Sequence, residues 1–366
     1  MSKYSFLTKA GVGLSLGLSV SWSVFAESNS RPVVATSIKP VTMIVEAIAG
    51  DYAQVNQIVS NTASPHDFAL RPSDIRKIHQ ADTVVWVGES LESFMEKVLV
   101  NANKFDTSIE WLTLSNMTLR DFSDHDDHDD HDDHDDHDDH DDHDDHDDHE
   151  EHKHEHDDHE EHDDHEDHED HEDHEDHEEH KHDHEDHEGH EGAHNHEGVD
   201  PHVWLDPNNA IVLAKVVTEK LSTLSPENQP HYELNLTAFI ESVESAKLAI
   251  NDSLKQQKNV NYMVFHDAYG YFEDRFDIHP VDVITVNPDR KPGAKKISEI
   301  QTMIHEGKVQ CVFTEPQFNP AIVSVLLEGS EVKTAELDPI GIDIKNGPLA
   351  YKDFLLNLEK QIHSCF

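Results

Sequence analysis

One segment, residues 124–197, limits what this chain can fold into more than any other feature. It holds 42 of the 78 acidic residues and 26 of the 34 histidines, and its first part repeats His-Asp-Asp with a period of three. That period does not match the 3.6 residues of a helical turn, so the histidines would not share one helix face. With like charges throughout and almost no apolar side chain, the segment cannot bury a core. We therefore expect a disordered insert between folded parts.

The charge of the chain restricts its partners. The 366 residues carry a formal net charge of −51 with histidine counted as neutral. A polyanion of this kind repels phosphate backbones and anionic lipid, so we expect no nucleic-acid partner and look to cations instead. The regular histidines from His125 to His196 predict accessory, weak sites for divalent metal ions, which should weaken in mild acid because metal needs the neutral ring. An acidic linker without a metal role is the alternative.

The N-terminus predicts export. Two lysines precede the apolar stretch Ala10–Val20, and Val24-Phe25-Ala26 supplies small residues for a cleavage site. We expect a signal peptide over residues 1–26, because the apolar run is well below the roughly 20 residues that a membrane anchor needs. In an exported chain the only two cysteines, Cys311 and Cys365, should form a disulfide. Two buried free thiols are the alternative.

Short β-rich runs alternate with helical patterns on both sides of the insert, which predicts an α/β fold with mainly parallel sheets. Before the insert we expect strands at Val33–Ile38, Val55–Val59, Thr83–Gly88 and Ile109–Leu112, and helices at Pro40–Ala49, Pro72–His79 and Leu91–Val100. After it we expect strands at Tyr262–Phe265, Val281–Val286, Gln310–Thr314 and Lys333–Leu337, and helices at Asp267–Phe276, Gly293–Glu306, Pro320–Leu327 and Ala350–His363.

A long helix is expected to bridge two similar halves. Asp206-Pro207 is typical of a helix start, and no Gly or Pro interrupts the chain from His231 to Val260. We divide the chain into an N-terminal lobe (27–123 and 198–224), a rigid linker helix (225–260) and a C-terminal lobe (261–366). A ligand would bind in the cleft between the lobes, at the carboxyl ends of the strands.

Three of the eight histidines outside the insert lie at strand ends or loops that face this predicted cleft. His66 follows a strand and its short loop, His266 stands where a strand stops, and His202 precedes a helix N-terminus. Three imidazoles and a fourth oxygen ligand make a tetrahedral Zn²⁺ site. Asp67 and Asp267, next to two of these histidines, could cap helices or orient the rings. Structural or surface histidines are the alternative, because no compact metal-binding motif is present.

Several sequence blocks together resemble a known family. They are Ser64-Pro65-His66-Asp67-Phe68, Leu70-Arg71-Pro72-Ser73-Asp74, Asp200-Pro201-His202-Val203-Trp204-Leu205-Asp206-Pro207, Phe265-His266-Asp267-Ala268-Tyr269-Gly270-Tyr271-Phe272, Thr314-Glu315-Pro316-Gln317-Phe318 and Leu337-Asp338-Pro339-Ile340-Gly341. In this order, and over essentially the whole chain outside the insert, they resemble the zinc-binding receptors of bacterial ABC importers, the ZnuA-type members of the metal-binding receptor family. Zinc-type members also commonly have a His-rich insert and a C-terminal disulfide.

The resemblance implies a periplasmic solute-binding protein that captures Zn²⁺ between its lobes and delivers it to a zinc ABC permease with a cytoplasmic ATPase. We expect the protein to be a monomer. It implies that His66, His202 and His266 are the metal ligands. Some members have a Glu before the first histidine, whereas Pro65 cannot coordinate, so the fourth position falls to Asp338 or a water. Manganese-binding relatives carry a Glu where His266 stands, and imidazole there favours zinc.

Two other functions fit a three-histidine site. A zinc hydrolase would need a general base beside the open metal position, and Glu315 is the candidate near a strand end. A metal-buffering or adhesion protein without a transporter would share the fold and differ only in its partners. We expect a binding protein and not an enzyme.

Overall fold

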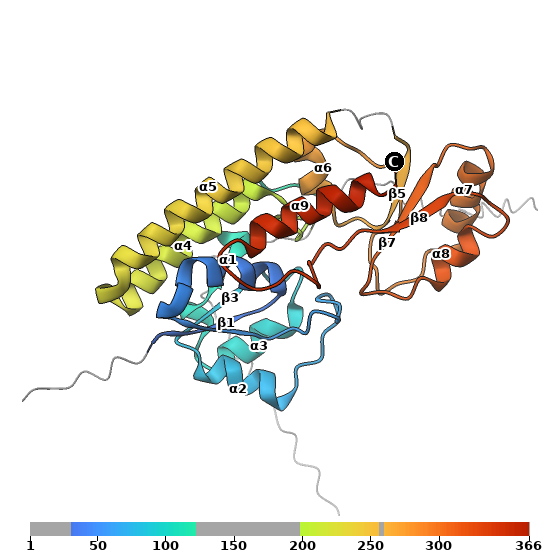
Figure 1. Cartoon of the computed structure of the whole chain (residues 1–366). Helices are drawn as coiled ribbons and strands as arrows, with labels where there is room; N and C mark the ends of the chain where they lie inside the picture. The colour runs from blue at the N-terminus through green and yellow to red at the C-terminus, as the bar shows by residue number, and fades with distance from the viewer. Residues whose placement is uncertain (1–30, 122–197, 256–259, 366) are drawn as a thin grey trace, which may run out of the picture. The chain divides into compact units, whose positions relative to one another are not determined.

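The computed structural model describes residues 31–121, 198–255 and 260–365. The predicted signal peptide (1–26) and the predicted disordered insert (124–197) lie outside these residues. The described part contains two four-stranded sheets, both parallel throughout, with α-helices packed around them (Figure 1). This confirms the predicted α/β fold class with two similar lobes. Within the described ranges, no helix combines the length and apolar character needed to cross a membrane.

The first sheet has the strand order β2-β1-β3-β4. Its strands are β1 (Val33–Thr36), β2 (Gln54–Gln57), β3 (Thr83–Trp86) and β4 (Ile109–Glu110), and its connecting helices are α1 (Lys39–Ala49), α2 (Pro72–Gln80) and α3 (Ser93–Asn101). All four residues of β3 are buried, as expected for a strand that is covered on both faces. The chain passes from β1 to one side and then to the other, and ligands of open parallel sheets bind near such a reversal.

The second sheet repeats this topology with the order β6-β5-β7-β8. Its strands are β5 (Tyr262–His266), β6 (Asp282–Thr285), β7 (Cys311–Thr314) and β8 (Lys333–Glu336), and its helices are α6 (Gly270–Phe276), α7 (Ala294–His305), α8 (Ala321–Leu326) and α9 (Ala350–His363). Strand β5 is buried along its whole length, whereas the edge strand β8 is largely exposed. The carboxyl end of β5 is therefore the position that corresponds to the end of β1 in the first lobe.

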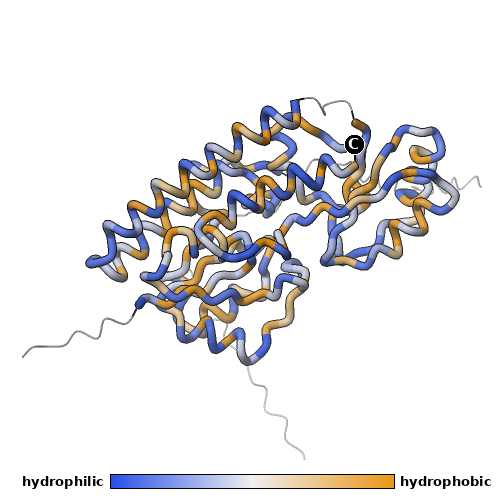
Figure 2. Tube along the Cα trace, in the orientation of Figure 1, coloured by the Kyte–Doolittle hydropathy of each residue, from blue (hydrophilic) through white to orange (hydrophobic). Residues whose placement is uncertain are grey.

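Two long helices, α4 (Pro207–Leu224) and α5 (Gln229–Leu254), pack against each other (Figure 1). The buried residues of α5 recur every three, four or seven positions and form one stripe, while polar residues alternate with apolar ones along its length (Figure 2). This stripe packs against α1 of the first lobe and α9 of the second. The predicted bridging helix is confirmed. As described, the helix ends at Leu254, and β5 begins at Tyr262.

The disulfide between Cys311 and Cys365 is present, which confirms that prediction. It joins the first residue of β7 to the chain just after α9, across a sequence separation of 54 residues. Closing a loop of this length stabilises the fold by about 4 kcal/mol on the chain-entropy model, because the unfolded chain loses freedom. The last helix is thereby attached to a central strand of the second sheet.

Candidate metal centre

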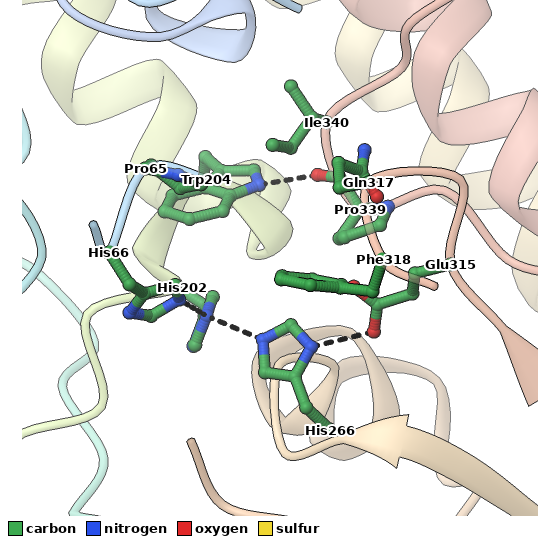
Figure 3. Close-up of a pocket in the computed structure, with 10 residues that line it drawn as sticks. All are labelled: Pro65, His66, His202, Trp204, His266, Glu315, Gln317, Phe318, Pro339 and Ile340. Atoms are coloured by element: carbon green, nitrogen blue, oxygen red, sulfur yellow. Dashed lines mark hydrogen bonds and ion pairs between the residues drawn. The ribbon is translucent and has the colours of Figure 1, made fainter. Parts of the chain in front are cut away.

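The three predicted histidines come from separate elements and meet at one place (Figure 3). His66 lies in the loop between β2 and α2, His202 directly precedes the 3₁₀ turn Val203–Leu205, and His266 is the last residue of β5. One ring nitrogen from each lies within 4.8 Å of the others. Residues up to 200 positions apart in the chain are thus brought together because one comes from a loop beyond the first sheet and one from the central strand of the second.

The spacing of the rings fits a tetrahedral metal ion. The Nε2 atoms of His66 and His202 are 3.3 Å apart, and those of His202 and His266 are 3.2 Å apart. A tetrahedral ion with bonds of roughly 2.0–2.1 Å to imidazole nitrogen would hold its ligand nitrogens about 3.3–3.4 Å apart. The Nε2 of His202 therefore lies at ligand spacing from both other rings, and all three ligand nitrogens lie within 4.8 Å of one another.

Two carboxylates fix the orientation of two of the rings. His202 Nδ1 donates to Asp200 Oδ1 at 2.7 Å, and His266 Nδ1 donates to Glu315 Oε1 at 2.7 Å. A carboxylate on Nδ1 holds the proton there, so Nε2 keeps its lone pair for a metal ion, and it also makes the ring more basic as a ligand. Both pairs are buried. Among the described residues, no carboxylate bonds the ring of His66 in this way.

Burial keeps His66 neutral. Desolvation lowers its pKa well below the usual value, and the nearby His202 and His266 lower it further. Burial by itself would raise the pKa of Asp200, but His202 and Arg120 outweigh it and the pKa is lowered. The centre thus combines a neutral imidazole with an ionised orienting carboxylate near pH 7, which is the protonation state that metal binding requires.

The walls of the centre are mainly apolar and enclose little space. The pocket is lined by the three histidines together with Pro65, Trp204, Glu315, Gln317, Phe318, Pro339 and Ile340 (Figure 3). Its cavity volume is about 10 Å³, which is on the order of the space that one water occupies. Trp204 Nε1 donates to Pro339 O at 2.7 Å and so links the turn after His202 to the second lobe. The pocket has room for a single ion with one small further ligand.

The structure does not bring Asp338 into this group. Its carboxylate accepts from Gln317 Nε2 at 2.8 Å and from the backbone N–H groups of Ile340 and Ile342. Asp67 is exposed, and the Oδ2 of Asp267 has no partner among the described groups. Asp267 does not orient the ring of His266, the histidine it follows, because Glu315 holds the Nδ1 of that ring.

The two orienting carboxylates carry signals that sequence reasoning could have used. Asp200 stands two residues before His202, and one oxygen accepts from both the backbone N–H and the ring of that histidine. Glu315 directly follows β7, the neighbour of β5 in the sheet. Parallel neighbours end at the same edge, so a carboxylate after one strand lies beside a histidine that ends the next.

Comparison with known proteins identifies sequence relatives of this chain. The sequence model of the family described as "Zinc-uptake complex component A periplasmic", ZnuA, matches residues 34–365. The high-affinity zinc uptake system protein ZnuA of Yersinia pestis is 33% identical over 334 residues, covering 91% of this chain and 90% of that protein. The protein of the same description from Haemophilus influenzae is 39% identical over 332 residues, covering 91% and 92%.

Solved structures share the fold at lower sequence identity. A crystal structure of ZnuA superposes with a TM-score of 0.64 at 20% identity, covering 92% of this chain and 99% of that one. The binding protein FpvC from Pseudomonas aeruginosa in complex with Mn²⁺ reaches a TM-score of 0.62 at 16% identity, covering 92% and 98%. The shared fold by itself does not identify a metal. On the extent of the sequence match, this chain belongs to the ZnuA family of periplasmic zinc-uptake components.

Proposed function

We propose that this chain is a periplasmic zinc receptor, which binds Zn²⁺ through the Nε2 atoms of His66, His202 and His266 and delivers it to an ABC permease driven by a cytoplasmic ATPase. The observation that carries the proposal is the convergence of three Nε2 atoms at ligand spacing, with carboxylates on two of the rings. Three imidazole ligands suit zinc, whereas manganese prefers sites made mainly of oxygen ligands. Membership of a family of zinc-uptake components supports the same cargo.

The shape of the pocket supports a receptor over a zinc hydrolase. A hydrolase has to admit a substrate beside the metal-bound water, whereas this cavity of about 10 Å³ holds little more than the ion. Glu315, the candidate general base, lies on the side of the His266 ring that faces away from the three Nε2 atoms (Figure 3). It is placed to orient a ligand and not to take a proton from water at the metal.

We propose a solvent oxygen as the fourth ligand. The carboxylate of Asp338 already accepts two backbone hydrogen bonds that hold the turn from Asp338 to Ile342, and a third from Gln317 Nε2. Turning an oxygen toward zinc would leave backbone N–H donors without partners, at a cost of about 1–3 kcal/mol for each buried group. Asp338 is in this view a structural residue beside the centre.

The remaining parts of the proposal concern the chain outside the centre. Residues 1–26 act as the export signal, His125 to His196 form weak accessory metal sites, and the receptor works as a monomer. The lobes divide at residues 27–123 with 198–224, 225–260 and 261–366. The match to a periplasmic family supports export, and the long buried stripe of α5 supports a linker helix between two lobes.

The ligand assignment is tested by zinc titration of single variants. His66→Ala, His202→Ala and His266→Ala should each weaken the tight site by about 100-fold or more, because each removes one of the few bonds to the ion. The exposed His305→Ala on α7 is the matched control and should bind as the parent does. Asp338→Asn should stay within about threefold of the parent if solvent is the fourth ligand.

Competition with a zinc-binding dye, in protein lacking residues 124–197, gives these affinities without signal from the accessory sites. Parent-like binding in any two of the three histidine variants would overturn the assignment. Zinc-dependent turnover of an activated ester by the parent, lost in His202→Ala, would favour the hydrolase. Restored growth at low zinc of a strain that lacks its own receptor would support the transport role.

A further inference from the structure

Arg120 lies where the chain enters and leaves the insert. Asp121 and Val199 form an antiparallel bridge, and Asp200 N–H donates to Arg120 O at 2.9 Å. The hydroxyl of Tyr271, on α6, joins both sides: it accepts from Arg120 N–H at 3.1 Å and donates to Asp200 O at 2.8 Å. The backbone around Arg120 is thus held against a helix of the second lobe, and its side chain starts from a defined position.

The guanidinium group of Arg120 sits among carboxylates from both lobes. It donates through Nη1 to Asp200 Oδ2 at 2.7 Å, and its Nε lies 3.3 Å from Asp274 Oδ2. Asp267 lies 3.9 Å from Nη1, and the group stands over the ring of Tyr271 at 5.9 Å. Arginine suits this place because its flat group stays charged and presents five donors in fixed directions.

Gly270 gives the guanidinium its room. A Cβ added to that glycine would lie 1.7 Å from Arg120 Nη1, so the guanidinium would have to move away. The φ angle of Gly270 is not among the positive ones, so the requirement for glycine here is one of space. Helix α6 therefore begins with a residue that leaves a place for an arginine from the other lobe.

The contacts form a continuous line from Arg120 to a proposed zinc ligand. Arg120 occupies Oδ2 of Asp200, and the other oxygen of that carboxylate accepts from the Nδ1 of His202. Asp200 is fully buried, and these two side chains hold its two oxygens. A buried carboxylate that is held at one oxygen presents the other in a fixed direction, whereas one that loses its cation is strongly destabilised.

We infer that Arg120 is a positioning residue of the zinc centre, which fixes the ring of His202 through Asp200 and ties that ligand to α6 of the second lobe. This inference rests on the proposed function, because it concerns how the same centre is kept in order. Arg120 does not touch the metal position. Its effect should appear in zinc affinity and disappear when Asp200 can no longer transmit it.

Two variants remove the contact in different ways. Arg120→Met keeps a long side chain without the charge, and Gly270→Ala leaves the arginine but displaces its guanidinium. We expect each to weaken zinc binding by about 10-fold, the lower end of the range for groups that orient a ligand. Arg275→Met is the matched control, because Arg275 on α6 makes an equally close pair with Asp206 that does not reach a histidine. It should change the affinity by less than about twofold.

A double-mutant cycle in the full chain separates positioning from general damage. Asp200→Asn alone should weaken binding, and adding Arg120→Met to it should cost less than about a further twofold, since the path is already broken. Full additivity, or an equal loss in Arg275→Met, would overturn the inference. Parent-like zinc binding in both single variants, Arg120→Met and Gly270→Ala, would overturn the inference as well.

A second readout needs no metal. In the zinc-free protein, ¹⁵N–¹H spectra of histidine side chains should show a slowly exchanging Nδ1–H of His202, which is lost or shifted in Arg120→Met and unchanged in Arg275→Met. An unchanged resonance in Arg120→Met would contradict the inference. If His202→Ala itself leaves zinc binding intact, the proposed function fails; if only the Arg120 and Gly270 variants behave like the parent, the inference alone fails.

Discussion

Two buried acidic residues away from the metal centre have pKa values that are raised by their surroundings. Burial raises the pKa of Glu273, on α6, to about 8, and the hydroxyl of Tyr262 donates to its Oε1 at 3.1 Å. Burial likewise raises the pKa of Glu92 to about 7, although the backbone N–H groups of Val87 and Gly88 donate to it. Both carboxyl groups are more easily protonated in the folded chain than in the unfolded one.

This difference predicts a pH dependence of stability. The folded-state pKa of Glu273 lies above its ordinary value of 4.5. Its contribution to the free energy of unfolding is therefore complete below pH 4.5 and is lost as the pH rises toward about 8. Glu273→Gln should reduce the fall in unfolding free energy between pH 5 and pH 8, because a neutral amide does not titrate. Glu92 is still present in this variant and should keep part of the dependence of unfolding free energy on pH.

Urea unfolding at several pH values measures this effect. Glu241→Gln, at an exposed position of α5, is the control and should follow the parent. An unchanged slope in Glu273→Gln would show that this carboxyl does not carry the pH dependence.

At the scale of elements, short local signals account for where several helices begin. The predicted start at Asp206-Pro207 matches α4, whose N-cap Asp206 accepts from Asn208 N–H at 2.8 Å. The predicted start at Asp267 is three residues early, because residues 266–269 form a turn in which Ala268 N–H donates to His266 O and α6 begins at Gly270. A side-chain cap depends on residues that are close in the sequence. The turn before α6 depends instead on where strand β5 ends.

The cap of α4 gives a prediction with two separable parts. Asp206→Ala should lower the unfolding free energy by roughly 1–2 kcal/mol for the lost cap, and further because Arg275, which binds both oxygens of Asp206, loses its partner. Asp206→Asn keeps a capping oxygen and should lose only the part that depends on charge. Denaturant titration compares them, and equal losses in the two variants would contradict a role for the cap.

At the scale of the whole molecule, we expect two classes of metal site. A site held by two folded lobes requires less ordering than imidazoles on a charged linker, so it should bind more tightly. Calorimetric titration with zinc should therefore show one tight equivalent followed by several weaker ones. Deleting residues 124–197 should remove only the weak class. The deletion leaves the bridged pair Asp121 and Val199 only a short loop apart, which suits a simple hairpin connection.

Loss of the tight equivalent on this deletion would mean that a histidine of the insert completes the centre, and the proposed division between tight and weak sites would be wrong. A titration of the zinc-free parent and of the deleted protein at the same pH provides the comparison. Lowering the pH to about 5.5 should weaken the accessory sites because imidazoles near carboxylates gain protons there.

The sequence by itself determined the features that depend on local pattern: alternating strands and helices, a long uninterrupted helix, three histidines beside strand ends, and two cysteines available for pairing. Only the tertiary structure decided which groups meet. Asp200 and Glu315 accept hydrogen bonds from two of the histidine rings. Asp338 accepts from the backbone of its own turn, and Arg120 pairs with Asp274 of α6. Pattern sets the period and the caps of an element, but the partner of a buried polar atom depends on how two lobes pack, since each such atom takes the donor or acceptor that folding places beside it.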